Sequence, residues 1–171
     1  MITKDAIASL FEYHYARNRE IWASMMTLSE AQFMQDVPYS HGSLQQQWIH
    51  MIDDDAKWLA FLMGANMARL ATFDYPTRES VKLAYDKIEA SALDFVAQVD
   101  ETILKLVYQW HVPHIAEIQY VAGWEVLLHM VNHGTDHRAQ ILRILHDFGA
   151  PSSDQDLLGY WLSSGRLARQ G

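Results

Sequence analysis

The sequence predicts an all-α protein, a four-helix bundle with a short C-terminal helix, and three observations support this fold class. Apolar residues recur at three- and four-residue steps in four long segments, as they do on the buried faces of amphipathic helices. Serine or threonine stands where three of these helices should begin, and glycine stands where two of them should end. Four apolar stripes must bury one another, which favours a bundle.

The first two helices are predicted from their caps. The first runs from the cap Thr3 to about Leu28, and the second runs from the cap Ser43 to about Met63, where Gly64 ends it. The turn-forming residues between them predict a loop.

The third helix follows the break at residues 73–76, where Pro76 interrupts the helical pattern. Thr77 is its expected cap, and the pattern fades near Asp100. The segment Thr102–Tyr108 fits either a short strand or a helical extension, and the periodicity does not decide between them.

The fourth helix is expected from about Glu117 to Phe148, with Gly149 closing it. Residues 157–162 then fit one short amphipathic helix packed on the bundle. The connection before the fourth helix is long enough for a crossover, so the order of the helices in space stays open. Residues 1–171 are expected to form a single domain.

Composition excludes several classes of function. The net charge is −8, with 13 basic and 21 acidic residues, which argues against nucleic acid as a partner. The absence of cysteine excludes disulfides, thiolate metal sites and cysteine nucleophiles. No basic leader with an apolar run begins the chain and no apolar stretch is long enough to span a bilayer, so we expect a cytoplasmic protein with no membrane partner.

His133 and His137 form the best chelating pair in the sequence. Residues four apart on a helix differ by only about 40° in direction and lie one turn apart, so both imidazoles can reach one ion. Zinc and nickel accept neutral imidazole, and a catalytic site typically has three protein ligands with a position left open. Spacing alone also fits two partly solvated polar residues.

A third ligand must come from another helix, and His50 is the best candidate because it lies in the middle of one. The competitor is His14, for which a hydrogen-bonded core histidine is the simpler interpretation. His129 extends the stripe of the pair by one turn and is interpreted as a packing or outer residue. Three further histidines are predicted to lie in loops, which makes them weaker candidates than His50: His41, His111 and His114.

Two segments resemble a known family. The segment VLLHMVNHGTDHRAQIL, residues 126–142, is similar to the signature helix of the DinB/YfiT-like superfamily of metal-dependent enzymes, with its HxxxHRxQ motif after an HxxNH approach. The segment HGSLQQQWIH, residues 41–50, resembles the second helix of that family, followed here by Trp58 and Leu59. Asp136 and Ala139 depart from residues common in the family, but neither departure removes a ligand.

The resemblance implies a four-helix bundle, often a homodimer, with a divalent transition metal on His50, His133 and His137. Some members of the family are thiol-dependent transferases or isomerases in which the metal activates a low-molecular-weight thiol. The resemblance therefore implies a metal-dependent transferase or hydrolase that binds zinc or nickel and acts on a small molecule. The alternative is a non-catalytic metal-binding structural or stress-response protein.

Other site chemistries lack their motifs. The sequence contains no Glu-x-x-His pair for a di-iron bundle, no HExxH, no GxSxG and no glycine-rich phosphate loop. Metal-bound imidazoles usually donate their second N–H to a carboxylate or amide, and the candidates are Asp53, Asp54 and Gln140. Asp54 and Gln140 can lie beside the site, whereas Asp53 is expected to face water.

Overall fold

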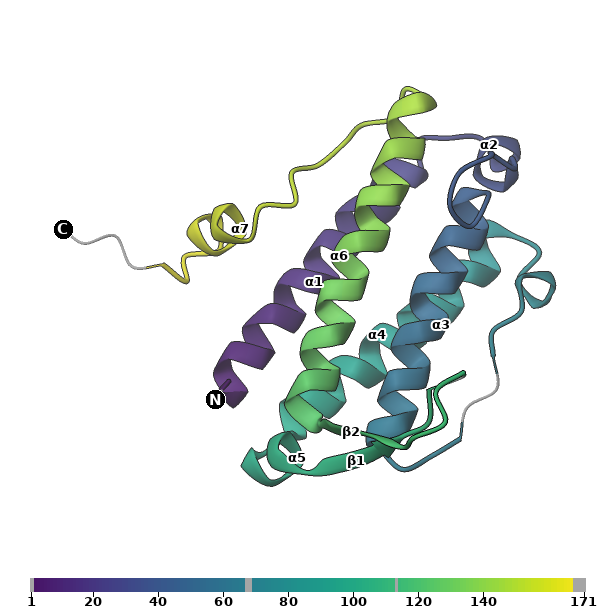
Figure 1. Cartoon of the computed structure of the whole chain (residues 1–171). Helices are drawn as coiled ribbons and strands as arrows, with labels where there is room; N and C mark the ends of the chain where they lie inside the picture. The colour runs from purple at the N-terminus through teal and green to yellow at the C-terminus, as the bar shows by residue number, and fades with distance from the viewer. Residues whose placement is uncertain (1, 67–68, 113, 168–171) are drawn as a thin grey trace.

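The computed structural model describes residues 2–66, 69–112 and 114–167, and this part of the chain is mostly helical (Figure 1). The predicted all-α class is confirmed, apart from one small β-hairpin. None of the helices in the described ranges combines the length and apolar character that a membrane span requires. The long helices are α1 (Lys4–Met25), α3 (Leu44–Leu62), α4 (Arg78–Gln98) and α6 (Gly123–Asp147).

The predicted caps of the first three long helices are confirmed. The hydroxyl groups of Thr3, Ser43 and Thr77 each accept a hydrogen bond from a backbone N–H in the first turn that follows. These bonds satisfy backbone donors that have no partner within the helix. Local sequence therefore determines where α1, α3 and α4 begin.

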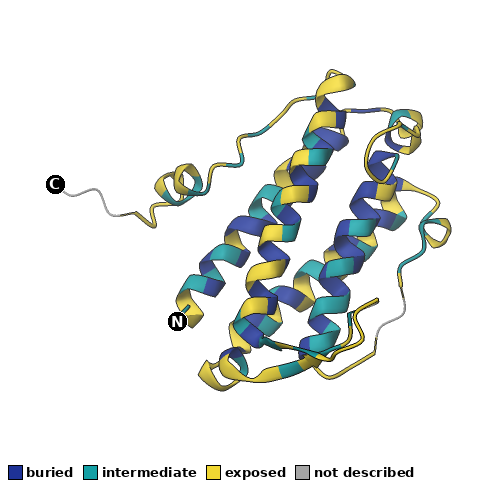
Figure 2. Ribbon diagram, viewed as in Figure 1, coloured by how far each residue is buried: buried dark blue, intermediate teal, exposed yellow. Residues whose placement is uncertain are grey.

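The long helices pack through their apolar faces. Helix α6 contacts both α1 and α3, and α4 contacts the same two helices (Figure 1). The faces turned toward one another are buried, whereas the outer faces are exposed (Figure 2). This arrangement settles the spatial order that the sequence left open, and it places α3 beside α6.

The short elements lie in the connections between the long helices. They are α2 (Glu30–Met34), a 3-10 turn η1 (Thr72–Asp74), α5 (Glu101–Lys105), β1 (Val107–Trp110), β2 (Gln119–Ala122) and α7 (Leu157–Ser163). Helix α7 is the predicted C-terminal helix, and Tyr160 on it packs edge-on against Tyr13 of α1.

The predicted start of the fourth helix at Glu117 is wrong. Gln119–Ala122 forms β2 instead, which pairs antiparallel with β1, and α6 begins at Gly123. Tyr120 and Val121 suit a strand, and pairing with β1 satisfies their backbone groups. At Gly123 a Cβ would lie 2.2 Å from the carbonyl oxygen of Ile103, so the junction requires glycine.

A buried polar chain joins three of the long helices. Arg138 Nη1 of α6 donates to Nδ1 of His14 in α1 over 2.9 Å, so His14 carries its hydrogen on Nε2. That nitrogen lies 3.3 Å from Oδ2 of Asp55 in α3. Each of these three residues is at most 1% exposed. His14 is therefore a hydrogen-bonded core histidine, as predicted.

Further hydrogen bonds complete this chain. Arg138 Nε donates to Gln155 Oε1 over 2.8 Å, and its Nη2 donates to Thr135 Oγ1 over 2.8 Å. Nη1 of Arg138 also donates to Asn18 Oδ1 over 3.0 Å. A buried guanidinium needs such partners because its desolvation is costly. The imidazole of His14 thus bridges a buried cation and a buried carboxylate.

Gly134 makes room for this chain. A Cβ at Gly134 would lie 2.2 Å from His14 Cε1. We expect Gly134→Ala to lower the free energy of unfolding by about 1–3 kcal/mol, although alanine is the better helix former. Urea denaturation measures this change. In a His14→Ala background the same substitution should cost little, and an equal cost in both backgrounds would contradict the steric explanation.

Candidate metal centre

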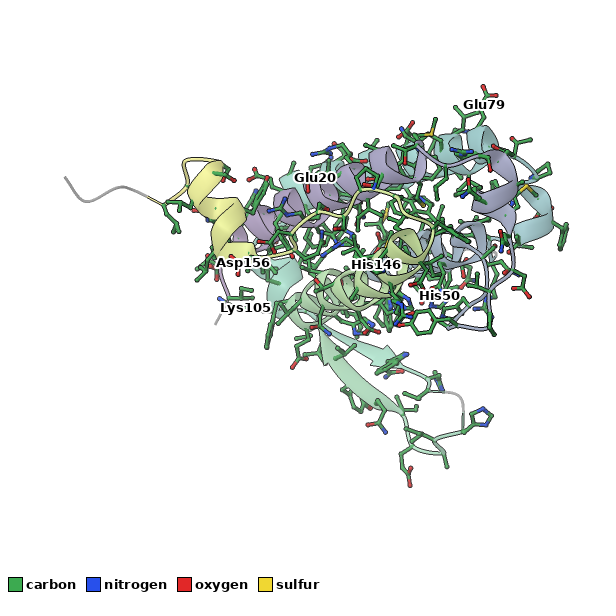
Figure 3. The ribbon with its side chains drawn as sticks, turned by 90° about the horizontal axis from the view of Figure 1, so that it is seen from above. Glu20, His50, Glu79, Lys105, His146 and Asp156 are labelled. Carbon is green, nitrogen blue, oxygen red and sulfur yellow. The ribbon has the colours of Figure 1, made fainter. Side chains whose placement is uncertain are left out.

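Five side chains that suit a metal ion meet where α3 faces α6. They make two groups whose ligand atoms lie within 4.8 Å of one another, and both groups include His50. Figure 3 shows His50 beside α6. The first group consists of His41, His50 and His137, and the second consists of His50, Asp54 and His133.

The pair on α6 converges, as its spacing predicts. The Nε2 atoms of His133 and His137 lie 3.0 Å apart, and the ring centroids are 4.2 Å apart. One face of a regular helix presents both rings, so little reorganisation is needed for both to approach one ion.

Helix α3 supplies an imidazole and a carboxylate one turn apart. The His50 ring lies 4.6 Å from that of His137 and 5.6 Å from that of His133, measured between centroids. Asp54 Oδ2 lies 3.1 Å from Nε2 of His133 and 3.4 Å from Nε2 of His50. Lys57 donates to the other oxygen of Asp54 over 2.9 Å. The carboxylate therefore connects the two helices.

His41 belongs to this cluster, although its predicted place in a loop did not make it a candidate ligand. Its ring stacks on that of His50 at 3.8 Å and lies 5.4 Å from that of His137. The turn around it has positive φ at Ser40 and Gly42, and at Gly42 a Cβ would lie 2.3 Å from Gln46 Oε1. The glycine directly after His41 was the available signal, but it does not show which way the turn folds.

The three polar residues considered as neighbours of the ligand imidazoles lie in different surroundings. Asp54 contacts Nε2 of two of the imidazoles and belongs to one of the candidate ligand groups, so it lies among the possible ligands rather than behind them. Gln140 instead donates to Asp136 over 3.1 Å and bonds with Ser40. The prediction that Asp53 faces water is wrong: it is 3% exposed and accepts a hydrogen bond from Leu70 N over 2.7 Å. The backbone returning after α3 covers Asp53, which helical periodicity does not reveal.

His129 lies at the edge of the cluster. Its ring is 5.6 Å from that of His133 and 5.1 Å from that of Trp58. Neither candidate ligand group in the described ranges includes it. Its position agrees with the predicted packing role.

The electrostatics of the cluster favour neutral imidazoles. Burial, followed by the charges of His133, His50 and His41, lowers the pKa of His137 from 6.5 to about 4. Burial also lowers the pKa of His50. Burial opposes ionisation of Asp54, but hydrogen bonds from His133 and Lys57 outweigh it and hold the pKa of Asp54 below its ordinary value. Near pH 7 the cluster therefore offers imidazole lone pairs beside a carboxylate.

These residues fit a divalent transition metal. Metal binding needs deprotonated imidazole, which the lowered pKa values of His50 and His137 supply. His137 Nδ1 is buried and has no hydrogen-bond partner, as expected where polar groups are arranged for something other than protein contacts. Nitrogen and oxygen donors suit zinc and nickel.

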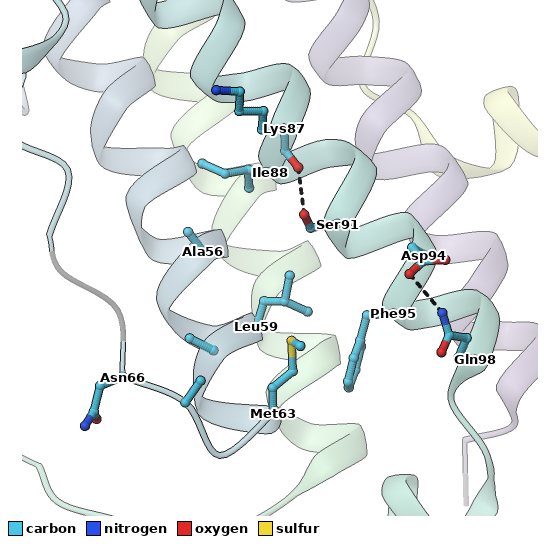
Figure 4. Close-up of a pocket in the computed structure, with 12 residues that line it drawn as sticks. Ala56, Leu59, Met63, Asn66, Lys87, Ile88, Ser91, Asp94, Phe95 and Gln98 are labelled. Atoms are coloured by element: carbon cyan, nitrogen blue, oxygen red, sulfur yellow. Dashed lines mark hydrogen bonds between the residues drawn. The ribbon is translucent and has the colours of Figure 1, made fainter.

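A separate hollow of about 480 Å³ between α3 and α4 has no comparable chemistry (Figure 4). Leu59, Met63 and Phe95 form much of its wall. Some of its polar side chains bond within α4: Ser91 donates to the Lys87 carbonyl over 2.9 Å, and Gln98 donates to Asp94 over 2.8 Å.

The lowered pKa of His137 predicts a pH dependence for the metal-free protein. The unfolded chain takes up the proton near pH 6.5, but the folded chain does so only near pH 4. Stability should therefore be complete above pH 6.5 and fall by about 1–2 kcal/mol as the pH drops to 4, after allowance for solvent screening. Urea denaturation across this range measures it. The fall should be smaller in His137→Gln, and identical pH profiles would contradict the assignment.

Comparison with known proteins identifies the family of this chain. No curated protein matches the sequence. The family model described as DinB family matches residues 1–166, which include α1 through α7 and both candidate ligand groups. The chain therefore belongs to the DinB family.

Proposed function

We propose that the protein is a metal-dependent enzyme of the DinB type that acts on a small molecule. In this proposal residues 1–171 form one domain, the four long helices are the family's four-helix bundle, and His50, His133 and His137 hold zinc or nickel. The observation that carries the proposal is that imidazoles from α3 and α6 lie side by side in two overlapping candidate groups that share His50, although neither group contains all three of these histidines. The predicted homodimer and cytoplasmic location stay predictions.

The choice of this trio rests on rigidity. Both ligand groups contain His50, but one combines it with His137 and the other with His133. His41 is the third member of the first group and Asp54 of the second, so each is an alternative ligand. His133 and His137 stand on adjacent turns of one helix, and His50 stands on the helix packed against it. His41 is exposed and lies in a turn, so it is less firmly held. Sites on rigid elements hold ligand geometry better than sites on loops.

Asp54 lies beside two of the proposed ligands. Its Oδ2 is within 3.4 Å of a nitrogen of both His50 and His133, and Lys57 fixes the opposite oxygen. Both contacts are made through Nε2, and Nε2 of His133 also faces His137, so the carboxylate lies on the ligand side of the rings as a candidate fourth ligand. A bound divalent metal would lower the pKa of a thiol or a water molecule at an open position.

Partial exposure favours catalysis over a purely structural site. The side chains of His50, Asp54 and His133 are 23%, 20% and 17% exposed. Structural metal sites are typically closed by four protein ligands, whereas catalytic sites keep a position for water or substrate. A low-molecular-weight thiol is the proposed small-molecule partner, and thiol transfer or hydrolysis is the proposed reaction. A structural or stress-response role remains the second candidate.

Elemental analysis tests the metal site. We expect about one zinc or nickel ion per chain in the purified protein, and loss of at least nine-tenths of it in His50→Ala, His133→Ala and His137→Ala. Ser9→Ala on α1 is a control that should retain the metal, because neither candidate ligand group includes Ser9 or any other residue of α1. Full retention in both α6 variants would contradict the proposal. Loss of the metal in His41→Ala but not in His50→Ala would show that His41, rather than His50, is the third ligand.

An open coordination position can be tested in protein substituted with cobalt. We expect a small thiol, or azide, to shift the visible bands at millimolar concentration, because three neutral imidazoles leave both charge and coordination incomplete. Unchanged bands with both ligands would favour the structural role.

A further inference from the structure

An aromatic pocket adjoins the candidate metal centre on the side of the hairpin. It consists of two adjoining hollows of about 340 and 210 Å³ that share Trp58 of α3, Trp110 of β1 and His129 of α6. Phe61 completes one hollow, and Val121 lies in the wall of the other. The larger hollow is at the lower end of the size range of small-molecule pockets.

The rings of this pocket form walls around Trp58. Trp110 lies 5.4 Å from Trp58 at an interplanar angle of 67°, and His129 lies 5.1 Å away at 75°. Phe61 meets the same ring at 5.7 Å and 89°. Neither tryptophan is fully buried, so part of each ring remains open to a ligand. Perpendicular ring walls offer both faces and edges to a flat ring.

The charged groups around the pocket already have partners within the protein. Lys57 pairs with Asp53 and Asp54, and Glu125 accepts the Ala122 N–H over 2.8 Å. A charged ligand would have to compete with these contacts. The pocket therefore suits a neutral ligand, and the lining of the smaller hollow is largely aromatic and aliphatic.

The pocket lies next to the imidazole cluster and shares Asp54 with it. Asp54 lines the larger hollow and lies 3.1 Å from Nε2 of His133. His129 stands one turn before His133 on α6, so the wall of the pocket and the cluster are consecutive turns of one helix. A ring that packs against Trp58 and Trp110 therefore has the cluster as its neighbour.

We propose that this pocket is the substrate-binding subsite and that it takes a neutral planar aromatic group, whose substituent reacts at the imidazole cluster. The inference rests on the proposed function for the identity of the reacting site. The binding of the ring itself depends only on Trp58, Trp110 and their neighbours, so it can be measured without a metal.

The first experiment uses 2-naphthol and its saturated analogue decahydro-2-naphthol with metal-free protein labelled with 5-fluorotryptophan. We expect 2-naphthol to shift the ¹⁹F resonances of Trp58 and Trp110, and to bind about tenfold more tightly than the saturated alcohol. Resonances are assigned with single Trp→Phe variants. Shifts confined to other tryptophans, or equal affinities for the two alcohols, would overturn the subsite.

Variants separate aromatic recognition from simple apolar burial. Trp110→Leu keeps an apolar side chain on the hairpin but removes the flat ring. We expect it to weaken the binding of 2-naphthol about tenfold, and we expect the same of Trp58→Ala. Trp161→Ala on α7 is the matched control and should bind as the wild type does, since Trp161 is not among the residues of either hollow. Unchanged affinity in Trp110→Leu would overturn the aromatic assignment even if Trp58→Ala fails to fold.

The link to the cluster is tested with cobalt-substituted protein and two thiols, benzyl mercaptan and cyclohexylmethanethiol. Benzyl mercaptan should shift the visible bands at about tenfold lower concentration, and this preference should disappear in Trp110→Leu. Binding of 2-naphthol without any preference between the thiols would overturn the role as substrate subsite. Failure of cobalt to bind at all, with 2-naphthol still bound, would contradict the proposed function instead.

Discussion

Arg138, His14 and Asp55 form the buried chain on which the positions of α1, α3 and α6 depend. The guanidinium and the carboxylate are both removed from water, and removing one partner of a buried pair typically costs about 3–5 kcal/mol. His14 bridges them in its neutral form, because burial lowers its pKa despite the opposing effect of Asp55. Gly134 lets the His14 ring lie directly against α6. The three helices can therefore pack in only one register without leaving a charge unpaired.

The same register sets the candidate metal centre. Asp55 follows Asp54 in α3, and Arg138 follows His137 in α6, so each helix directs one residue into the buried chain and its neighbour toward the cluster. Successive helical residues differ by about 100° in direction, which separates the two roles. A shift of either helix by one residue would therefore both break the buried chain and move the imidazoles apart. Stability and site geometry are thus coupled through adjacent residues.

The hairpin between α5 and α6 supplies a wall that the helices alone do not provide. Trp110 comes from β1 and meets Trp58 of α3, while His129 completes the pocket from α6. Binding residues commonly lie on such connecting segments, which a rigid scaffold holds in position. The helices hold the imidazoles, and the hairpin shapes the space beside them.

Local sequence determined the long helices, since caps such as Ser43 and the apolar period act within a few residues. It also determined that His133 and His137 share a face, because helix geometry alone places residues four apart together. Only the tertiary structure decided that His41 stacks on His50, that Asp53 is covered by the returning chain, and that Gln119–Ala122 is a strand rather than a helical turn. These features depend on contacts between segments distant in sequence or on the direction of a turn, and no local pattern of residues specifies either.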